Sequence, residues 1–303
     1  MKITRTALVA AVAATFALTA CAAPDDASGS GGGPDEDKTV AAQEVDAEAA
    51  GMLPADIADA GVVKVASGVS FPPMEYFDTD NKTVLGFDAD LGRALGDVLG
   101  VEFEFQNTNF DGIIGGLTAH RYDLALTSMI DKPERQTQVD FVDYLSSGVT
   151  FLVVKGNPEG LTEQSDLCGR AVAVEKAATG DLVADDISKD CEAAGKPPVD
   201  KSPLPDQASA IQALQSGRAD AVLALDLTLA YNVKQNPDTF EVPAKPFGAL
   251  PVGIAFPKDS TQLRDAVAAA LKVLQENGTY DELLAKWNLT DQALTGAPIN
   301  SGK

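Results

Sequence analysis

The sequence predicts an α/β fold built as two lobes, and two observations support this prediction. A chain of 303 residues with 45% apolar content can bury a sizeable core, and its length suits two domains or two lobes. Strand-like and helix-like stretches alternate from about residue 62 onward. Such alternation is typical of largely parallel sheets with helices on both faces.

The first set of elements begins with a strand at 62–66 and ends with a short helix that opens near Pro133. Between these two, the apolar patterns predict helix 88–99, strand 101–106, helix 110–117 and strand 122–127.

The second set follows a long apolar strand at 149–154. The same patterns then predict strand 171–174, helix 208–216, strand 221–225, helix 228–234, strand 251–256 and helices 263–276 and 280–287. Because no sequence repeat links the two sets, we expect similar lobes built from different sequences.

The first twenty residues follow the plan of a secretory signal peptide. Lys2 and Arg5 precede the apolar stretch 7–18, which is too short to span a membrane comfortably. The junction Leu-Thr-Ala-Cys at 18–21 resembles a bacterial lipobox, in which the cysteine is lipidated and becomes the mature N-terminus. An ordinary signal peptide with an incidental cysteine is the alternative. We therefore expect an extracytoplasmic protein whose Cys21 anchors it to the outer face of the cytoplasmic membrane.

Residues 22–55 are rich in Ala, Gly, Ser, Asp, Glu and Pro, and we expect them to form a disordered tether. No later segment approaches the roughly 20 consecutive apolar residues that a membrane-spanning helix needs. The mature protein should therefore be anchored at the membrane and not threaded through it.

The charge balance disfavours a nucleic-acid partner. Without Lys2 and Arg5, the chain keeps 21 basic and 45 acidic residues, a net charge of −24. Binding to phosphates requires a basic face.

The cysteine count predicts one disulfide. With Cys21 assigned to lipid, Cys168 and Cys191 remain, and an exported chain meets oxidising conditions. Two reduced thiols are the alternative. Two cysteines and the single histidine, His120, fit no metal site, and we expect no cofactor.

Short motifs spread along the chain carry a resemblance to a known family. The most specific are Phe-Pro-Pro-Met-Glu-Tyr at 71–76, Gly-Phe-Asp-Ala-Asp-Leu at 86–91 and Tyr-Asp-Leu-Ala-Leu-Thr-Ser at 122–128. Further matches lie at 133–135, 139–141, 216–221, 278–280 and 286–287. In this order and spacing they resemble the family 3 extracellular solute-binding proteins that serve polar amino acid importers. The resemblance covers nearly everything from Gly61 to Asn300.

The resemblance implies a type II periplasmic-binding-protein-like fold, in which two crossing hinge strands join two α/β lobes that close on a ligand. Lobe 1 would comprise residues 56–147 plus 248–303, and lobe 2 residues 148–247. The crossings should lie near 145–150 and 244–249. The ligand would be an amino acid or a related small amine or carboxylate, delivered to an ABC permease and ATPase in trans. We expect a monomer.

Arg135 stands where the family places the arginine that binds the ligand carboxylate. An arginine offers two parallel donors in fixed geometry, which suits a carboxylate that has lost its water. In the sequence, Asp131 reads as an N-cap and Pro133 as a first-turn proline, so Arg135 should lie near a helix start. The alternative is a surface arginine paired with Glu134 or Asp131.

Five further residues, together with Asp226, complete the predicted ligand site. Thr127 and Ser128 end a strand, where open α/β sheets place their binding crevices, although a local turn or cap is the alternative. Phe71 and Phe110 match positions where the family sandwiches the ligand's side chain, with core packing as the alternative. Thr179 opens a helix in the second lobe and could contact an anionic end.

Three positions depart from the family pattern. Ile130 replaces a common hydroxyl residue, which removes one donor near the carboxylate. Leu225 stands where an aspartate usually holds the α-ammonium, so either Asp226, one place on, reaches the ligand or the ammonium is held differently. Gly68 occupies a position that carries an acid in some relatives of basic specificity, which favours a neutral or apolar ligand side chain.

Two other functions remain as alternatives. The same fold is similar to that of dehydratases that act on cyclohexadienyl substrates, for which Glu75 and Glu175 are the candidate acids. Since neither has a nucleophile, a histidine base or a metal cluster beside it, we expect no enzyme. The chain could also present its solute to a membrane kinase, in which case a lone kinase gene, and no permease gene, should lie next to its own.

Overall fold

The structure is a computed structural model that describes residues 40–303. The predicted signal peptide, the predicted lipidation site at Cys21 and the predicted tether up to residue 39 lie outside the described residues. Among residues 40–303, none of the helices combines the length and the apolar character needed to cross a membrane.

The described residues form ten α-helices, two short 3-10 helices and eleven strands. The helices are α1 Ala47–Ala50, α2 Ala55–Ala60, α3 Phe87–Leu99, α4 Phe110–Thr118, α5 Pro133–Gln136, η1 Gln164–Leu167, α6 Thr179–Ala193, α7 Gln207–Gln215, α8 Asp226–Gln235, α9 Thr261–Glu276, α10 Thr279–Trp287 and η2 Thr290–Gln292. The strands are β1 Val62–Ser67, β2 Tyr76–Phe77, β3 Val84–Leu85, β4 Glu102–Asn107, β5 Leu124–Ile130, β6 Val139–Val154, β7 Ala171–Glu175, β8 Asp200–Leu204, β9 Ala221–Leu225, β10 Phe240–Glu241 and β11 Phe247–Pro257.

The main strands lie in the order β4-β1-β5-β11-β6-β9-β7-β8. β1 pairs in parallel with β4 and β5, and β7 pairs in parallel with β8 and β9. Only the two middle strands, β6 and β11, run antiparallel to their neighbours. The predicted α/β fold with largely parallel sheets is therefore confirmed.

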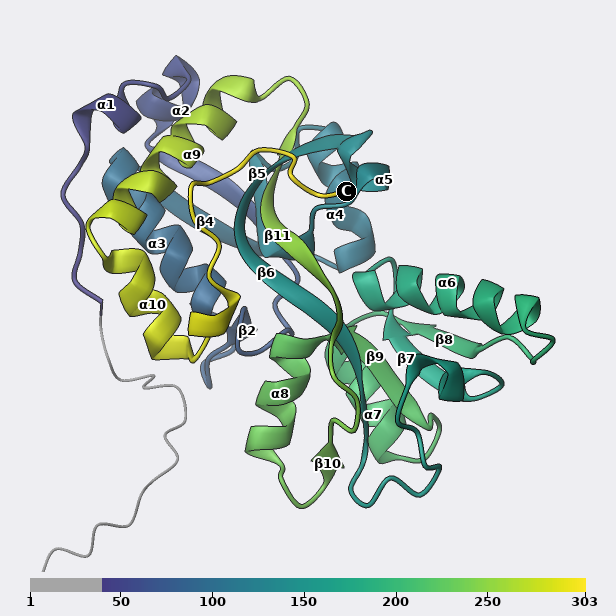
Figure 1. Cartoon of the computed structure of the whole chain (residues 1–303). Helices are drawn as coiled ribbons and strands as arrows, with labels where there is room; N and C mark the ends of the chain where they lie inside the picture. Colours follow the sequence, from purple (N-terminus) through teal and green to yellow (C-terminus); the bar gives the residue numbers. More distant parts are fainter. Residues whose placement is uncertain (1–39) are drawn as a thin grey trace, which may run out of the picture. The chain divides into compact units, whose positions relative to one another are not determined.

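Helices cover both faces of each half of the sheet, because side chains along a buried strand alternate between its faces. In β5, Leu124 and Leu126 pack into the core beneath α3 and α9, while Ala125 and Met129 pack against α4. In the other half, α6 covers one face, and α7 and α8 cover the opposite face. These two layered halves are the lobes of Figure 1.

Two long strands connect the lobes. The first part of β6 pairs with β11, whereas its residues Val149 to Leu152 pair with β9 of the second lobe. β11 runs beside it in the opposite direction, with Phe247 opposite Val149 (Figure 1). This continuous antiparallel pair makes one sheet out of two lobes, and it lies where the hinge crossings are predicted.

The chain returns to the first lobe after β11. Helix α9 packs on α3 and β6, and α10 packs on both α3 and α9 (Figure 1). The last residues then cross back over β6, where Leu145 bridges to Ala293 and Val142 to Ile299. The C-terminal segment therefore completes the first lobe.

The tether was predicted to continue to residue 55, and this prediction is wrong for residues 40–55. The Asp46 carboxylate caps α1 by accepting from the backbone of Glu48 and Ala49. Ala49 and Leu53 are then buried in the core against α3 and α9. The small alanine side chains allow this close packing. The composition alone predicted a solvated chain, because alanine-rich segments with many charges often stay disordered.

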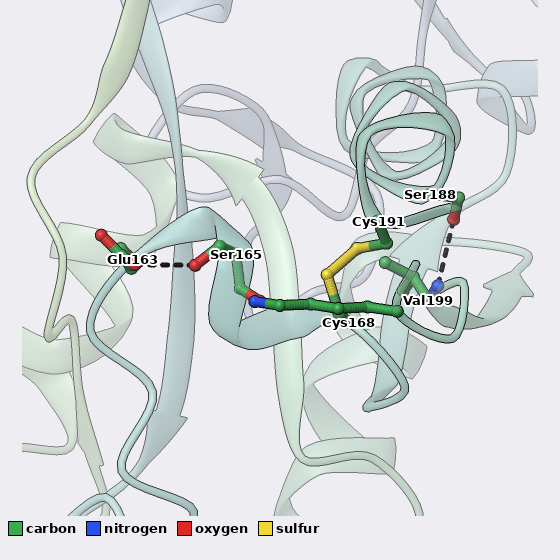
Figure 2. The surroundings of a disulfide bond; sticks show 7 residues. Glu163, Ser165, Cys168, Ser188, Cys191 and Val199 are labelled. Carbon is green, nitrogen blue, oxygen red and sulfur yellow. Dashed lines mark hydrogen bonds between the residues drawn. A yellow bond between two sulfur atoms is a disulfide. The ribbon is translucent and has the colours of Figure 1, made fainter. Parts of the chain in front are cut away.

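The predicted disulfide between Cys168 and Cys191 is confirmed. It joins the end of η1 to the buried face of α6, and the Val199 backbone donates to Ser188 close by (Figure 2). The bond therefore fastens the edge of the second lobe to its longest helix.

Candidate functional site

A cavity lies between the two lobes, at the carboxyl ends of the parallel strands. Its lining from the first lobe is Gly68, Phe71, Glu75, Phe110, Thr127 and Ser128. Its lining from the second lobe is Glu175, Ala178, Thr179, Gly180, Gln207, Leu223, Ala224 and Leu225. This is the edge at which open α/β sheets place their ligands.

The lobes are nearly closed over this cavity. Its volume is about 20 Å³, which suits roughly one water molecule and is too small for an amino acid. Three side chains make polar contacts between the lobes around it. The Arg135 guanidinium contacts Ala177 and Thr179, Lys176 Nζ binds Asp111 Oδ2 at 2.7 Å, and Thr228 Oγ1 donates to the Pro72 carbonyl at 2.7 Å. A solute of amino-acid size therefore enters only after the lobes separate.

Arg135 is buried, with 4% of its surface exposed, so it is not the surface arginine of the alternative reading. Nη1 donates to the Ile130 carbonyl at 2.9 Å and contacts Thr179 Oγ1 at 3.5 Å, while Nη2 donates to the Ala177 carbonyl at 2.9 Å. It is not itself among the residues that line the cavity. It lies against Thr179 and Phe110, which do line it.

The positive charge of Arg135 has no anionic partner in an ion pair among residues 40–303. Its guanidinium carbon lies 5.4 Å from the centre of the Phe110 ring, in a cation–π contact. Burial lowers the pKa of Arg135 to about 10, and Glu134 and Asp131 offset this only in part. The side chain stays charged at neutral pH, and a buried charge of this kind is stabilised by an anion.

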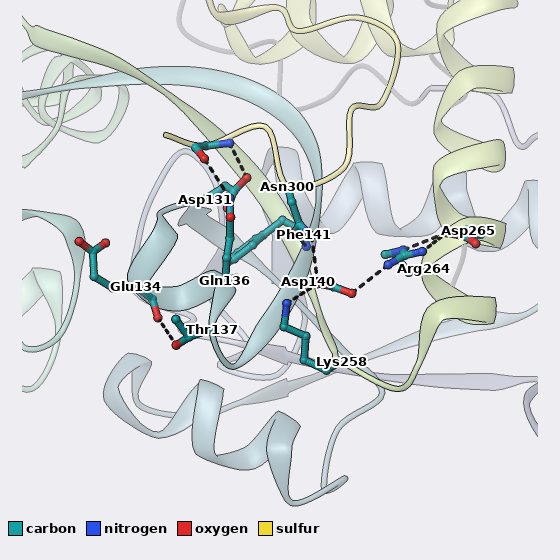
Figure 3. Close-up of polar contacts among 11 residues, drawn as sticks. Asp131, Glu134, Gln136, Thr137, Asp140, Phe141, Lys258, Arg264, Asp265 and Asn300 are labelled. Carbon is teal, nitrogen blue, oxygen red and sulfur yellow. Dashed lines mark hydrogen bonds and ion pairs between the residues drawn. The ribbon is translucent and has the colours of Figure 1, made fainter.

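Helix α5 is held in place by contacts with a distant segment of the chain, and not by the predicted N-cap. Its N-cap is Lys132, and Asp131 makes no capping bond to it. The buried Asp131 carboxylate instead accepts from Gln136 Nε2 at 2.7 Å and from the Gly302 backbone at 2.7 Å (Figure 3). A Cβ at Gly302 would lie 2.1 Å from the Asp131 carbonyl oxygen, so only glycine fits. The N-cap interpretation of Asp131 was wrong, because a distant segment satisfies this carboxylate.

The C-terminal segment makes further bonds beside α5. Asn300 Nδ2 donates to Asp140 Oδ1 at 3.0 Å, and Lys258 Nζ and Arg264 Nη1 also bind this carboxylate (Figure 3). Ser301 donates to Asp143 through both its backbone and its hydroxyl. The last residues of the chain therefore hold the turn that carries Arg135.

Thr127 and Ser128 both lie at the cavity, but their hydroxyl groups bind carboxyl groups of the protein. Thr127 Oγ1 donates to Glu75 Oε1 at 2.8 Å and accepts from the Gly68 backbone at 3.0 Å. The Ser128 backbone and hydroxyl donate to Asp88 at 2.9 and 3.2 Å. Ser128 has a φ of +50°, a left-handed conformation that is costly without glycine. These bonds fix the end of β5 in one conformation.

The aromatic residues and Thr179 also lie where the sequence places them. Phe71 is 9% exposed and lines the cavity, in a turn where its backbone bridges to Glu75. Thr179 opens α6, and a Cβ at the following Gly180 would lie 2.0 Å from the Leu223 carbonyl oxygen. Glycine therefore allows the start of α6 to approach β9 at the cavity.

Of the two neighbouring positions 225 and 226, only Leu225 lines the cavity. The Asp226 carboxylate accepts from Ser147 Oγ at 2.6 Å and from the Leu227 backbone at 2.8 Å. Ser147 lies on β6, within the crossing. The structure thus brings five of the predicted residues together around the cavity, with Arg135 behind them and Asp226 directed to the crossing. Their roles as ligand contacts remain predictions.

Glu75 and Asp88 form a buried carboxyl pair beneath the cavity. Burial, and next the charge of Asp88, raise the pKa of Glu75 well above its ordinary value. Burial raises the pKa of Asp88 to about 6, although bonds from Tyr144, Glu75 and Ser128 lower it. At neutral pH, Glu75 therefore keeps its proton, and Asp88 carries the charge of the pair.

Glu175, predicted only as a candidate acid of the alternative enzyme function, also lies at the cavity. It ends β7, is 5% exposed and lines the cavity. Burial, then the carboxylates of Asp206 and Asp111, raise its pKa to about 8. Its position at the carboxyl end of a predicted parallel strand was the available signal. Gln207, at the start of α7, also lines the cavity and was not predicted.

Comparison with known proteins agrees with this fold. Residues 63–290 match the profile of the bacterial extracellular solute-binding proteins, family 3. The arginine-binding protein ArgT of Corynebacterium glutamicum is 32% identical over 297 residues, which cover 97% of this chain and 94% of that protein.

The chain is also similar to solved structures, of which two are informative. An ancestral arginine-binding protein bound to arginine is 33% identical with a TM-score of 0.70, covering 75% of this chain and 98% of that one. AncCDT-1 is described as an ancestral amino acid-binding protein and a precursor of cyclohexadienyl dehydratase. It is 31% identical with a TM-score of 0.69, covering 77% of this chain and 97% of that one.

A two-lobed α/β chain with a cavity at the lobe boundary is the architecture of the solute-binding proteins that it resembles. The chain belongs to the bacterial extracellular solute-binding proteins of family 3.

Proposed function

We propose that the protein captures an amino acid or a related small amine or carboxylate outside the cell and delivers it to an ABC importer by closure of the cleft. The observation that carries this proposal is Arg135, a buried cation between the two lobes without an anionic partner among the described residues. Similarity to an arginine-binding protein over nearly the whole chain supports an amino-acid ligand.

The contacts of Arg135 suggest how binding and closure are coupled. Two of its partners, Ala177 and Thr179, belong to the second lobe, whereas Ile130 belongs to the first. When the lobes separate, the guanidinium loses its second-lobe partners and its donors become available to a carboxylate. Closure then removes water from the pair, which strengthens their attraction.

Replacement of Arg135 tests the proposal directly. Arg135→Ala should weaken binding of a carboxylate ligand about a hundredfold or more, because the ligand's anion would be buried without a partner. Arg121→Ala, at an exposed arginine of the same lobe, is the matched control. Calorimetric titration with a panel of amino acids measures both variants. Unchanged affinity in Arg135→Ala would remove this residue from the site.

The membrane anchor is part of the same proposal. The lipobox-like junction that ends at Cys21 supports a lipoprotein held at the outer face of the cytoplasmic membrane. A Cys21→Ser variant should then appear in the culture medium, whereas the unaltered protein fractionates with membranes. Membrane retention of the variant would argue against the anchor.

An enzyme on the same fold is a second candidate, favoured by one observation. Glu175 has a pKa of about 8 in the cavity, a property that a general acid needs. Similarity to AncCDT-1 does not separate the two functions, since that protein is itself described as amino acid-binding. Turnover of prephenate by the purified protein would favour the enzyme; we expect none.

A further inference from the structure

Glu175 is an acid that no residue among 40–303 neutralises. The residue is 5% exposed and lines the cavity, yet no hydrogen bond or ion pair reaches its carboxyl group within the described part of the chain. The charges that act on it most strongly are the carboxylates of Asp206 and Asp111. A buried carboxyl group surrounded by like charges is costly, and it calls for an explanation.

The nearest basic residue in the sequence does not supply the missing charge. Lys176 follows Glu175 directly, but its Nζ binds Asp111 Oδ2 at 2.7 Å, and 60% of its side chain is exposed. Gln207 lines the same cavity with a buried Nε2 that has no partner among residues 40–303. The second-lobe wall of the cavity therefore presents unpaired polar groups to whatever enters it.

Glu75, the other acid of the cavity, differs from Glu175 in this respect. Glu75 Oε1 accepts from Thr127 Oγ1 at 2.8 Å, while Glu75 Oε2 is buried without a hydrogen-bond partner among residues 40–303. The neighbouring Asp88 carboxylate accepts from Ser128 and Tyr144. The Glu75 and Asp88 pair therefore has partners within the protein, whereas the Glu175 carboxyl group has none among the described residues.

Glu175 and Arg135 are separate charged groups at the boundary of the lobes. The Arg135 guanidinium donates to the Ile130 and Ala177 carbonyls, and no hydrogen bond or ion pair joins it to Glu175. The α-ammonium of an amino acid is only one carbon away from its carboxylate. For a ligand whose carboxylate binds Arg135, we therefore expect the side chain to be the part that meets Glu175.

We propose that Glu175 is the counter-ion for a positive charge at the end of the ligand's side chain, so that the solute is a cationic amino acid. This inference rests on the proposed function. It replaces the expectation of a neutral side chain, which was based on the missing acid at Gly68. Here the acid comes from the second lobe, at the end of β7.

Binding then exchanges a proton for a ligand cation. In the closed, ligand-free site Glu175 is protonated at pH 7, and a guanidinium or ammonium group beside it favours the charged carboxylate. The proton leaves for solvent, and the new pair of opposite charges is electrically neutral.

The experiment compares L-arginine with L-citrulline, a neutral analogue of the same shape, by calorimetric titration of the mature chain. At pH 8 we expect L-arginine to bind about tenfold or more tightly than L-citrulline. In Glu175→Gln this ratio should fall to about threefold or less, because the amide carries no charge to attract the guanidinium. Glu192→Gln, at an exposed position of α6, should keep the ratio of the unaltered protein.

Proton release gives a second readout that needs no variant. In buffers of different ionisation enthalpy at pH 7, L-arginine should release close to one proton per molecule bound and L-citrulline almost none. Equal affinity for the two ligands, or a preference that survives in Glu175→Gln, would overturn the inference while leaving amino-acid capture intact. Failure of every amino acid to bind the unaltered protein would instead contradict the proposed function.

Discussion

Single residues set the charges of the cavity, and their environment matters more than their identity. Glu75 and Glu175 are both buried glutamates at the same cavity. Glu75 accepts a hydrogen bond from Thr127, whereas no hydrogen bond reaches Glu175 among the described residues, and the nearby carboxylates of Asp206 and Asp111 raise its pKa. The first is therefore part of the fold, and the second is available for a ligand.

The raised pKa of Glu175 predicts how stability depends on pH. Its value in the folded state is about 8, against an ordinary 4.5, so the folded protein binds more protons than the unfolded chain between these values. The free energy of unfolding without ligand should therefore fall as the pH rises from about 4.5 to about 8, by at most about 1.4 kcal/mol per pH unit for this group. Urea unfolding at pH 5 to 8 measures the slope.

The contribution of Glu175 is isolated by substitution. Glu175→Gln should flatten the slope, because the amide does not titrate, and Glu192→Gln should leave it unchanged. Equal slopes in the unaltered protein and Glu175→Gln would show that other buried acids dominate, foremost the Glu75 and Asp88 pair.

At the scale of elements, helix α5 shows how distant segments position a functional side chain. With four residues, it is too short to be stable by itself. Its position depends on Asp131 and Gln136, which bind each other and Gly302 (Figure 3). The C-terminal segment therefore helps to fix the orientation of Arg135.

Gln136→Ala should both destabilise the protein and weaken ligand binding. Loss of the Nε2 donor leaves the buried Asp131 carboxylate with one bond fewer, which costs about 1 to 3 kcal/mol. Urea unfolding and calorimetric titration measure the two effects. Gln138→Ala, at an exposed position two residues on, is the control and should change neither quantity. Full stability of Gln136→Ala would mean that the Gly302 bond suffices.

The bounds of β6 show that a pattern of apolar residues does not predict where a central strand begins. The sequence predicts a strand from residue 149, whereas β6 begins at Val139 and is 16 residues long. Its first part contains Asp140, Asp143 and Ser147, which interrupt the apolar run. Bonds from Arg264, Ser301 and their neighbours make these polar residues compatible with a central strand.

For the whole molecule, the feature that governs function is the contact between the lobes. Besides Arg135, the first lobe's Pro72 carbonyl accepts from Thr228 of α8, whose side chain is fully buried. The Lys176–Asp111 ion pair is largely exposed and contributes little. The closed form therefore depends on a small number of hydrogen bonds, and its population is readily shifted.

Thr228→Val should weaken ligand binding about fivefold, since closure would lose one hydrogen bond worth about 1 kcal/mol. It should also raise the radius of gyration of the ligand-free protein in X-ray scattering, because fewer molecules are closed. Thr228→Ser keeps the hydroxyl and should behave as the unaltered protein. If valine and serine gave the same affinity, the Thr228 bond would have no part in closure.

The sequence by itself determined the α/β class, most helices and strands, the disulfide and the residues at the ends of the parallel strands. These depend on local periodicity, on cysteine count and on the rule that such strand ends form binding edges. Only the tertiary structure decided that residues 40–55 pack on the core, that Asp131 binds Gly302, and that Glu175 is a buried acid without a partner among the described residues. Burial and charge compensation arise from segments far apart in the chain, so local patterns do not contain them.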